Sequence, residues 1–264
     1  MPSLDTRGII AAAQLGGYVL IAAASLYLTI RYALRRDAGW LFMFIFSATR
    51  VAGGALIVAG ELMKNPSEDL FLASYIMFHA GLAVLLLSTL GFLGLAGQNA
   101  YSEYLHTTRM FRAMAIFMLI AMGLAIAGGI LGSHIAPAQA HIGDILRKTA
   151  AALYGALYLV LFVIHLRCWG DRYELRSHRR RLLGGVLLAL PFLGARVAYE
   201  ILAAWSSSDL FGLEPASNKT LADFQPITGK WILFLVLGFV CEFVVAVMYM
   251  VFSTVLARSR SGRL

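Results

Sequence analysis

Six ionisable side chains lie inside long apolar stretches of this sequence, where a charged group is costly and a retained one usually has a role. They are Arg50, Glu61, His79, Arg196, Glu200 and Glu242. A carboxyl group in an apolar site can stay protonated at neutral pH and act as a general acid. An arginine can bind an anionic or phenolic group. These residue types therefore predict acid–base chemistry on a substrate held in apolar surroundings.

Spacing groups some of these residues. Arg50 and Glu61 are eleven residues apart, about three helical turns, so they share one helix face. Arg196 and Glu200 are four residues apart and can reach one another, so an internal ion pair that permits membrane insertion is an open alternative to a catalytic role. Glu61 as an interfacial helix cap and His79 as a packing residue are further alternatives. Glu242 has no basic neighbour in its apolar run, which favours a functional role.

Known metal and nucleophile motifs are missing from the sequence. It contains no Asp-rich metal motif, no paired histidine boxes, no His-Glu-x-x-His and no Gly-x-Ser-x-Gly. The last apolar stretch also has no lysine that could anchor a retinal Schiff base. We therefore expect neither a metal site nor a cofactor, and the chemistry is expected to rest on carboxyl groups.

The elements that must position these residues are membrane-spanning helices. The chain has 264 residues, of which 60% are hydrophobic and only 14% charged. A spanning helix needs ~20 mostly apolar residues, and seven stretches meet that length. They are Gly8–Ile30, Trp40–Met63, Phe71–Leu95, Met110–Leu131, Ala150–Cys168, Leu183–Ala204 and Trp231–Leu256. The sequence thus predicts an all-α fold, a single seven-helix transmembrane domain over residues 1–264.

Charge predicts the orientation of this bundle. Most of the 22 Lys and Arg residues fall in alternate loops and in the C-terminal tail: Arg31, Arg35, Arg36, Arg109, Arg112, Arg167, Arg172, Arg176, Arg179, Arg180, Arg181, Arg258, Arg260 and Arg263. The positive-inside rule then places the N-terminus in the lumen or outside the cell and the C-terminus in the cytosol. A glycosylation sequon at Asn218 falls on the lumenal side of this topology. The net charge of +8 indicates contact with membrane lipids rather than nucleic acid.

In this topology most of the intramembrane ionisable groups lie at the midplane or in the lumenal half of the membrane. Four tyrosines lie at the same depth: Tyr75, Tyr154, Tyr158 and Tyr199. Shared depth on different helices predicts a cavity there that opens towards the lumen or towards lipid.

One segment carries a family resemblance. Residues 190–200 follow the pattern Pro-Phe-Leu-x-x-Arg-x-x-Tyr, from Pro191 to Tyr199, within a compact seven-helix chain that has a basic fifth loop. The chain resembles a fungal seven-helix family similar to the membrane-bound terpene cyclases of meroterpenoid pathways, of the ascofuranone and macrophorin types. The resemblance implies a metal-independent class II-type cyclase in the endoplasmic reticulum membrane. Its substrate would be a lipid-soluble prenylated molecule of the farnesyl-phenol type, protonated at an epoxide or a terminal alkene.

On that hypothesis the site residues take definite roles. Glu61 or Glu242 is the acid, and Glu200 is a second carboxylate paired with Arg196. Arg50 or Arg196 binds the polar head of the substrate. His79 and Tyr199 are expected to be hydrogen-bond partners near the reacting groups, and Tyr75 and Tyr158 line the substrate site.

Two other functions are compatible with seven helices. A lipid- or drug-translocating exporter is one alternative, although seven helices do not divide into equal inverted repeats. A seven-helix receptor is the other, which a basic third cytosolic loop would suit, although the expected extracellular N-terminus is short and no extracellular disulfide pair is expected. Substrate flux without chemical change would identify the first, and ligand-dependent signalling the second.

Overall fold

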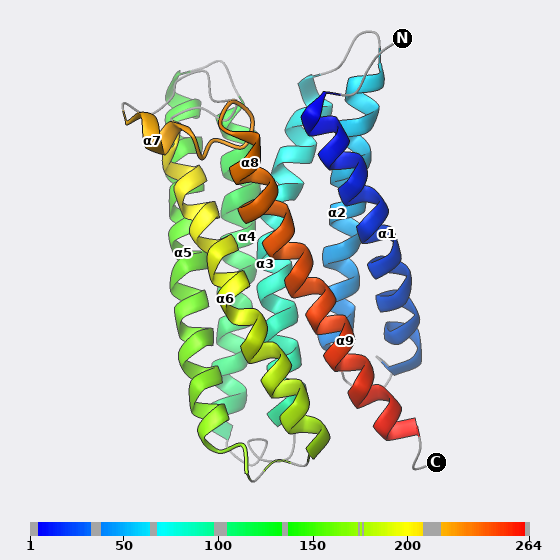
Figure 1. Ribbon diagram of the computed structural model, residues 1–264. Helices are drawn as coiled ribbons and strands as arrows, with labels where there is room; N and C mark the ends of the chain where they lie inside the picture. Colours follow the sequence, from blue (N-terminus) through cyan, green and yellow to red (C-terminus); the bar gives the residue numbers. More distant parts are fainter. Residues whose placement is uncertain are drawn as a thin grey trace.

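The computed structural model describes residues 5–32, 38–63, 68–97, 105–133, 137–173, 175, 177–207 and 218–261. The first part of the chain forms six long α-helices joined by short connections (Figure 1). They are α1 (Thr6–Tyr32), α2 (Ala38–Leu62), α3 (Glu68–Gly97), α4 (Leu105–Gly132), α5 (Pro137–Gly170) and α6 (Ser177–Trp205). A short α7 (Lys219–Ala222) precedes the seventh spanning helix, which is built from α8 (Trp231–Leu233), the π-helix η2 (Phe234–Val240) and α9 (Cys241–Ser261).

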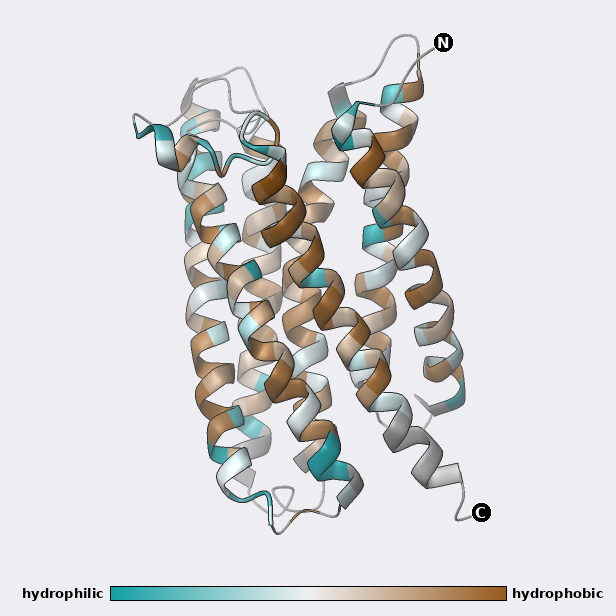
Figure 2. Cartoon of the chain, viewed as in Figure 1, coloured by the Kyte–Doolittle hydropathy of each residue, from teal (hydrophilic) through white to brown (hydrophobic). Residues whose placement is uncertain are grey.

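All seven long helices are long and apolar enough to cross a membrane. The prediction of an all-α seven-helix transmembrane bundle is confirmed. Large apolar side chains cover its outer surface, such as Leu20 at 73% exposure and Ile30 at 67%, as expected of a lipid-facing surface. Hydrophilic residues gather towards the two ends (Figure 2). The N-terminus and α7 lie at one end, here called the N-terminal end, and the C-terminus lies at the other, the C-terminal end (Figure 1).

The fifth helix begins earlier than hydropathy predicts. The sequence places its start at Ala150, whereas α5 begins at Pro137. The added turns contain Asp144, which pairs with Arg147 at 3.3 Å and with Lys148 at 2.6 Å. Pairs three and four residues apart lie on one helix face and support a helix that an apolar count misses.

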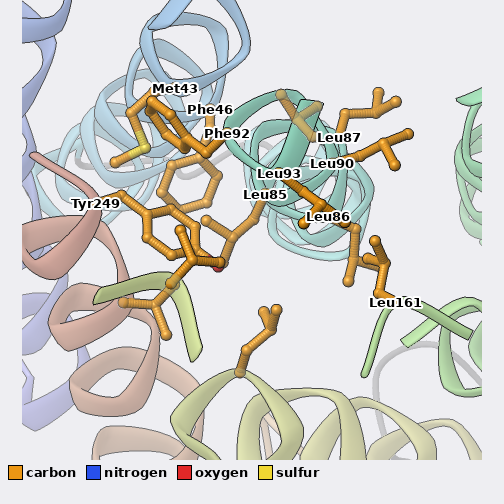
Figure 3. Packing of buried hydrophobic residues seen from close by; sticks show 14 of the residues in the cluster. Met43, Phe46, Leu85, Leu86, Leu87, Leu90, Phe92, Leu93, Leu161 and Tyr249 are labelled. Atoms are coloured by element: carbon orange, nitrogen blue, oxygen red, sulfur yellow. The ribbon is translucent and has the colours of Figure 1, made fainter. Parts of the chain in front are cut away.

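α3 is the central helix of the bundle and contacts α2, α4, α5 and α6. Its residues from Leu82 to Leu87 are all buried, so leucine side chains pack on every side of the helix (Figure 3). Towards α9, the Phe92 ring meets the ring of Tyr249 edge-on with centroids 5.4 Å apart. The Tyr249 hydroxyl also forms a 2.8 Å hydrogen bond with Thr89. This packing fills the half of the bundle nearest the C-terminal end.

Glycines bring α4 and α5 into backbone contact. Gly128 and Gly132 form a small-xxx-small pair on α4, and Gly143 faces them from α5. A Cβ atom at Gly143 would lie 2.7 Å from Cα of Gly132, and one at Gly128 would lie 3.0 Å from the carbonyl oxygen of Gly143. Close approach of this kind drives helix association in membranes, where the hydrophobic effect between helices is lost.

We expect Gly143→Leu to destabilise the bundle by ~1–3 kcal/mol, because the larger side chain forces α4 and α5 apart. The unfolding temperature of the detergent-purified protein, followed by size-exclusion chromatography after heating, measures the effect. Gly123→Leu is the matched control on α4, since a Cβ at Gly123 meets nothing within 4 Å. Equal stability of the two variants would contradict the proposed backbone contact.

Candidate functional site

The intramembrane charges predicted from sequence meet in one buried ionic cluster, made of Arg50, His79, Arg196, Glu200 and Glu242. Arg50 on α2 donates two hydrogen bonds to Glu242 on α9, from Nε to Oε1 and from Nη2 to Oε2, each 2.5 Å long. Both side chains are buried, at 2% and 1% exposure. A bidentate guanidinium–carboxylate pair of this kind is among the strongest side-chain hydrogen-bonding arrangements.

Arg196 on α6 extends the cluster to two further residues. Its Nε donates to Glu242 Oε2 at 3.0 Å, and its Nη1 donates to Glu200 Oε2 at 2.7 Å. Glu200 Oε1 in turn pairs with Nδ1 of His79 on α3. Arg50, Glu242, Arg196 and Glu200 thus alternate cationic and anionic groups across α2, α9 and α6, which neutralises charges that would be costly singly in a membrane.

Phe78 on α3 contacts both guanidinium groups. Cζ of Arg50 lies 4.8 Å from the centroid of the Phe78 ring, and Cζ of Arg196 lies 4.5 Å from it. Arg50 also donates from Nη1 to the Phe78 carbonyl at 2.9 Å. Gly81, one turn further on, leaves room for this group, since a Cβ there would lie 2.9 Å from Arg50 Cζ. Cation–π contact and tight packing thus hold two like charges near one another.

Glu242 is saturated by hydrogen-bond donors. Tyr18 on α1 donates its hydroxyl to Oε1 at 3.0 Å, in addition to the bonds from Arg50 and Arg196. These donors occupy both oxygens of the carboxylate, so Glu242 links α9 to α1, α2 and α6.

The π-helix η2 lies directly before Glu242 in the chain. Its backbone bonds span one residue more than those of an α-helix, so it rotates the residues that follow relative to those before it. Phe234 opens η2 and lies beside Phe78, with ring centroids 5.3 Å apart. The π-helix thus allows one helix to present Phe234 and, two turns later, Glu242 to the same interior region.

A cavity of about 800 Å³, here called the main cavity, lies on the N-terminal side of this cluster. It is bounded by α1, α2, α3, Phe234 and the segment before α8. Its walls are mostly small, apolar or aromatic, and it reaches the surface beside the exposed Asp5. The residues that line it include Arg7, Arg50, Gly53, Glu61, Phe71, Tyr75 and Phe234.

Arg50 and Glu61 line the main cavity together, as their shared helix face predicts. Arg50 belongs to both the cavity wall and the ionic cluster. Glu61 is only partly buried, and its Oε2 accepts a hydrogen bond from the backbone N–H of Asp5 at 3.1 Å. In the described part of the chain no ion pair involves Glu61. The acidic groups are thus of two kinds. Glu200 and Glu242 are ion-paired to arginines in the cluster, and Glu61 lies on the cavity wall.

The tyrosines that were expected near the substrate lie in different parts of the bundle. Tyr75 lines the main cavity, and its ring contacts that of His79 with centroids 4.3 Å apart. Tyr199 is buried against Arg196, whose Cζ lies 5.8 Å from the Tyr199 ring centroid. Tyr158 lies elsewhere: its hydroxyl donates to the Leu190 carbonyl at 3.0 Å, next to the helix-interior Pro191, and it does not line the main cavity.

Asn218, the predicted glycosylation site, is exposed at the start of α7. Its Oδ1 accepts hydrogen bonds from the backbone N–H and the hydroxyl of Thr220, at 3.1 and 2.6 Å. Its modification stays a prediction.

Three residues of the site were missed in the sequence. Tyr18 and Phe78 are one tyrosine and one phenylalanine among many in apolar helices, so neither composition nor spacing distinguishes them. Arg7 directly precedes the first predicted helix, which begins at Gly8, yet it lines the main cavity and donates to the Gly229 carbonyl at 2.9 Å. A charge next to the start of an apolar stretch is the signal that the sequence offered for it.

We expect Glu242→Gln to destabilise the bundle by ~3–5 kcal/mol, because it leaves two buried guanidinium groups without their shared carboxylate. Tyr18→Phe removes only one neutral donor to the same carboxylate and is expected to cost ~1 kcal/mol. Denaturant or thermal unfolding of both variants in one detergent tests the ranking. Similar losses for the two would show that Glu242 does not hold the cluster together.

Comparison with known proteins identifies a family. No curated protein and no solved structure matches the chain. Residues 4–259 match the model of a family described as Domain of unknown function (DUF7702). Since the match runs from the first helix into the last, the chain belongs to the DUF7702 family.

Proposed function

We propose that the protein is a membrane-bound, metal-independent terpene cyclase that acts on a prenylated, phenol-type substrate held in the main cavity. The observation that carries the proposal is that Arg50 and Glu61 line one largely apolar cavity from the same helix face. The family description names no activity, and the geometry and chemistry of this cavity support the proposal.

The size and lining of the main cavity suit a prenylated substrate. A volume of about 800 Å³ lies in the range of cavities that enclose drug-sized ligands. Phe71, Tyr75 and Phe234 contribute aromatic side chains to its wall. Aromatic faces can stabilise a carbocation and apolar walls keep water from it.

The two polar groups set the direction in which the substrate binds. Arg50 and Glu61 are separated by eleven residues of one helix, a rise of roughly 16 Å. A phenolic or quinone-like head would bind the guanidinium of Arg50, and an extended prenyl chain would then bring its terminus towards Glu61. The reverse direction would place a carbocation next to Arg50, where positive charge opposes it.

Glu61 is the proposed acid. It transfers its proton to the epoxide oxygen, or to the terminal alkene carbon, at the end of the prenyl chain. Internal double bonds then attack in turn, and the last cation loses a proton to a carboxylate on the cavity wall, Glu61 or Asp5. One proton enters and one leaves, so substrate and product are isomers. Glu200 and Glu242 are less suited, because arginine side chains occupy their carboxyl oxygens and neither residue lines the main cavity.

We expect Glu61→Gln to lower turnover by ~10²–10⁴-fold, the usual contribution of a positioned acid. Microsomes containing the protein would be incubated with a farnesylated phenol, with and without a terminal epoxide, and products analysed by mass and NMR. The control is Asp69→Asn, an exposed carboxylate on α3 that does not line the main cavity. A cyclic isomer formed equally well by Glu61→Gln would remove Glu61 from the mechanism, and the absence of product from folded wild-type protein would remove the cyclase proposal.

Filling the cavity tests substrate binding without touching an ionisable group. Gly53 lines the main cavity, and a Cβ there would make only ordinary contacts, the nearest with Met77 at 3.6 Å. We expect Gly53→Leu to reduce turnover of a farnesylated substrate more than that of a geranylated one, because it shortens the available space. Gly16→Leu is the control, since a Cβ at Gly16 meets nothing within 4 Å. Equal loss with both chain lengths would place the substrate elsewhere.

A ligand-sensing receptor is the second candidate, and one observation favours it. Arg50 lines the main cavity and also binds Glu242 on α9. An anionic ligand on Arg50 would compete with Glu242 and so weaken the contact between α2 and α9. Ligand binding that alters the helix arrangement, with no chemical change in the ligand, would support this function over the cyclase.

A further inference from the structure

A second cavity, of about 510 Å³, lies at the C-terminal end of the bundle between α5, α6 and α9. Three arginines line it: Arg172, Arg180 and Arg181. Arg172 is held in place by its neighbours, because its Nη1 donates to the Trp169 carbonyl at 3.2 Å and its Nη2 to the Tyr173 hydroxyl at 2.8 Å. Its guanidinium also stacks on both aromatic rings, with Cζ 5.2 and 4.4 Å from the centroids. One cationic group of this rim is thus preorganised.

The charges of the other two arginines are accessible to a ligand. Arg180 and Arg181 are exposed in the first turns of α6, and in the described part of the chain no carboxylate pairs with either. The positive end of the helix dipole adds to their field. Figure 2 shows a hydrophilic segment at the start of α6, at the C-terminal end of the bundle. The rim therefore concentrates positive charge where an anion can reach it.

The floor of the same cavity is apolar. Gly184 and Gly185 follow the arginines by one turn of α6 and line the cavity. The Trp169 ring lies on one side, 3.3 Å from where a Cβ of Gly184 would be, and Phe252 of α9 packs against Gly185. The two rings and the backbones of the two glycines form the apolar part of the cavity, here called the glycine slot. A basic rim above an apolar slot is complementary to an amphipathic anion.

We propose that this cavity binds an acidic glycerophospholipid, with its phosphate on the three arginines and an acyl chain in the glycine slot. The distribution of Lys and Arg predicts that this end faces the cytosol, where anionic lipids are abundant, and basic pockets between spanning helices bind such headgroups. The site lies at the opposite end of the bundle from the main cavity. Its occupancy does not depend on the proposed cyclase activity.

Native mass spectrometry of the detergent-purified protein, titrated with dioleoyl phosphatidic acid, measures this binding directly. We expect Arg180→Gln with Arg181→Gln to weaken it by about thirty-fold. The matched control is Arg109→Gln with Arg112→Gln, which removes two exposed arginines of α4 at the same end but outside the cavity. Wild-type and control protein should bind alike, and neither should retain dioleoyl phosphatidylcholine as strongly. Equal weakening in both double variants would reduce the interaction to general electrostatic attraction and overturn the proposal.

Two further measurements distinguish a lipid-binding site from a site for free phosphate. Gly184→Leu keeps all three arginines but fills the slot, so it should weaken binding of phosphatidic acid about ten-fold, as expected when one chain loses apolar burial. Inorganic phosphate, at concentrations that saturate the arginines, should displace the lipid only weakly. If Gly184→Leu binds the lipid normally and phosphate displaces it completely, the cavity is a free-anion site and the lipid proposal fails.

Discussion

The burial of two guanidinium groups in the interior of a membrane protein is the constraint on which the rest of this structure depends. A single charge at that depth is costly, and here one carboxylate, Glu242, serves both Arg50 and Arg196. These three residues come from α2, α6 and α9, so one set of hydrogen bonds ties the beginning, the later part and the end of the chain together. α3 completes the arrangement by packing the ring of Phe78 against both cations and leaving space at Gly81.

The same ion pairs give different surroundings to glutamates that look alike in the sequence. The carboxyl oxygens of Glu200 and Glu242 are occupied by arginine side chains, whereas Glu61 lies outside the cluster on the wall of the main cavity. Arg50 marks the inner limit of that cavity and carries a positive charge. A cationic reaction centre would therefore form away from Arg50, near Phe71 and Tyr75, and this is the part of the cavity that Glu61 can reach.

Local features of the structure could be predicted from the sequence, and long-range ones could not. Apolar length predicts the seven helices, and the four-residue spacing of Arg196 and Glu200 predicts their pair. The pairing of Arg50 with Glu242 joins residues 192 positions apart and depends on how each helix is rotated, which hydropathy does not determine. The π-helix before Glu242 changes that rotation and has no clear signature in its apolar sequence. Hydropathy also placed the start of α5 too late, because the first turns of this helix contain Asp144 and its basic partners.

The arrangement along the bundle axis bears on what the protein can do with a ligand. The main cavity reaches the surface near the N-terminal end and stops at Arg50. Beyond the ionic cluster, the described residues pack closely: the rings of Phe92 and Tyr249 meet edge-on, and Met43 and Phe46 lie beside them with almost no exposure (Figure 3). A ligand that enters the cavity meets ion pairs and then a filled core, so it must leave by the side from which it came. A blind cavity suits chemical conversion or sensing better than export through the bundle, because an exporter has to open a path that here would break the ion pairs joining α2, α6 and α9.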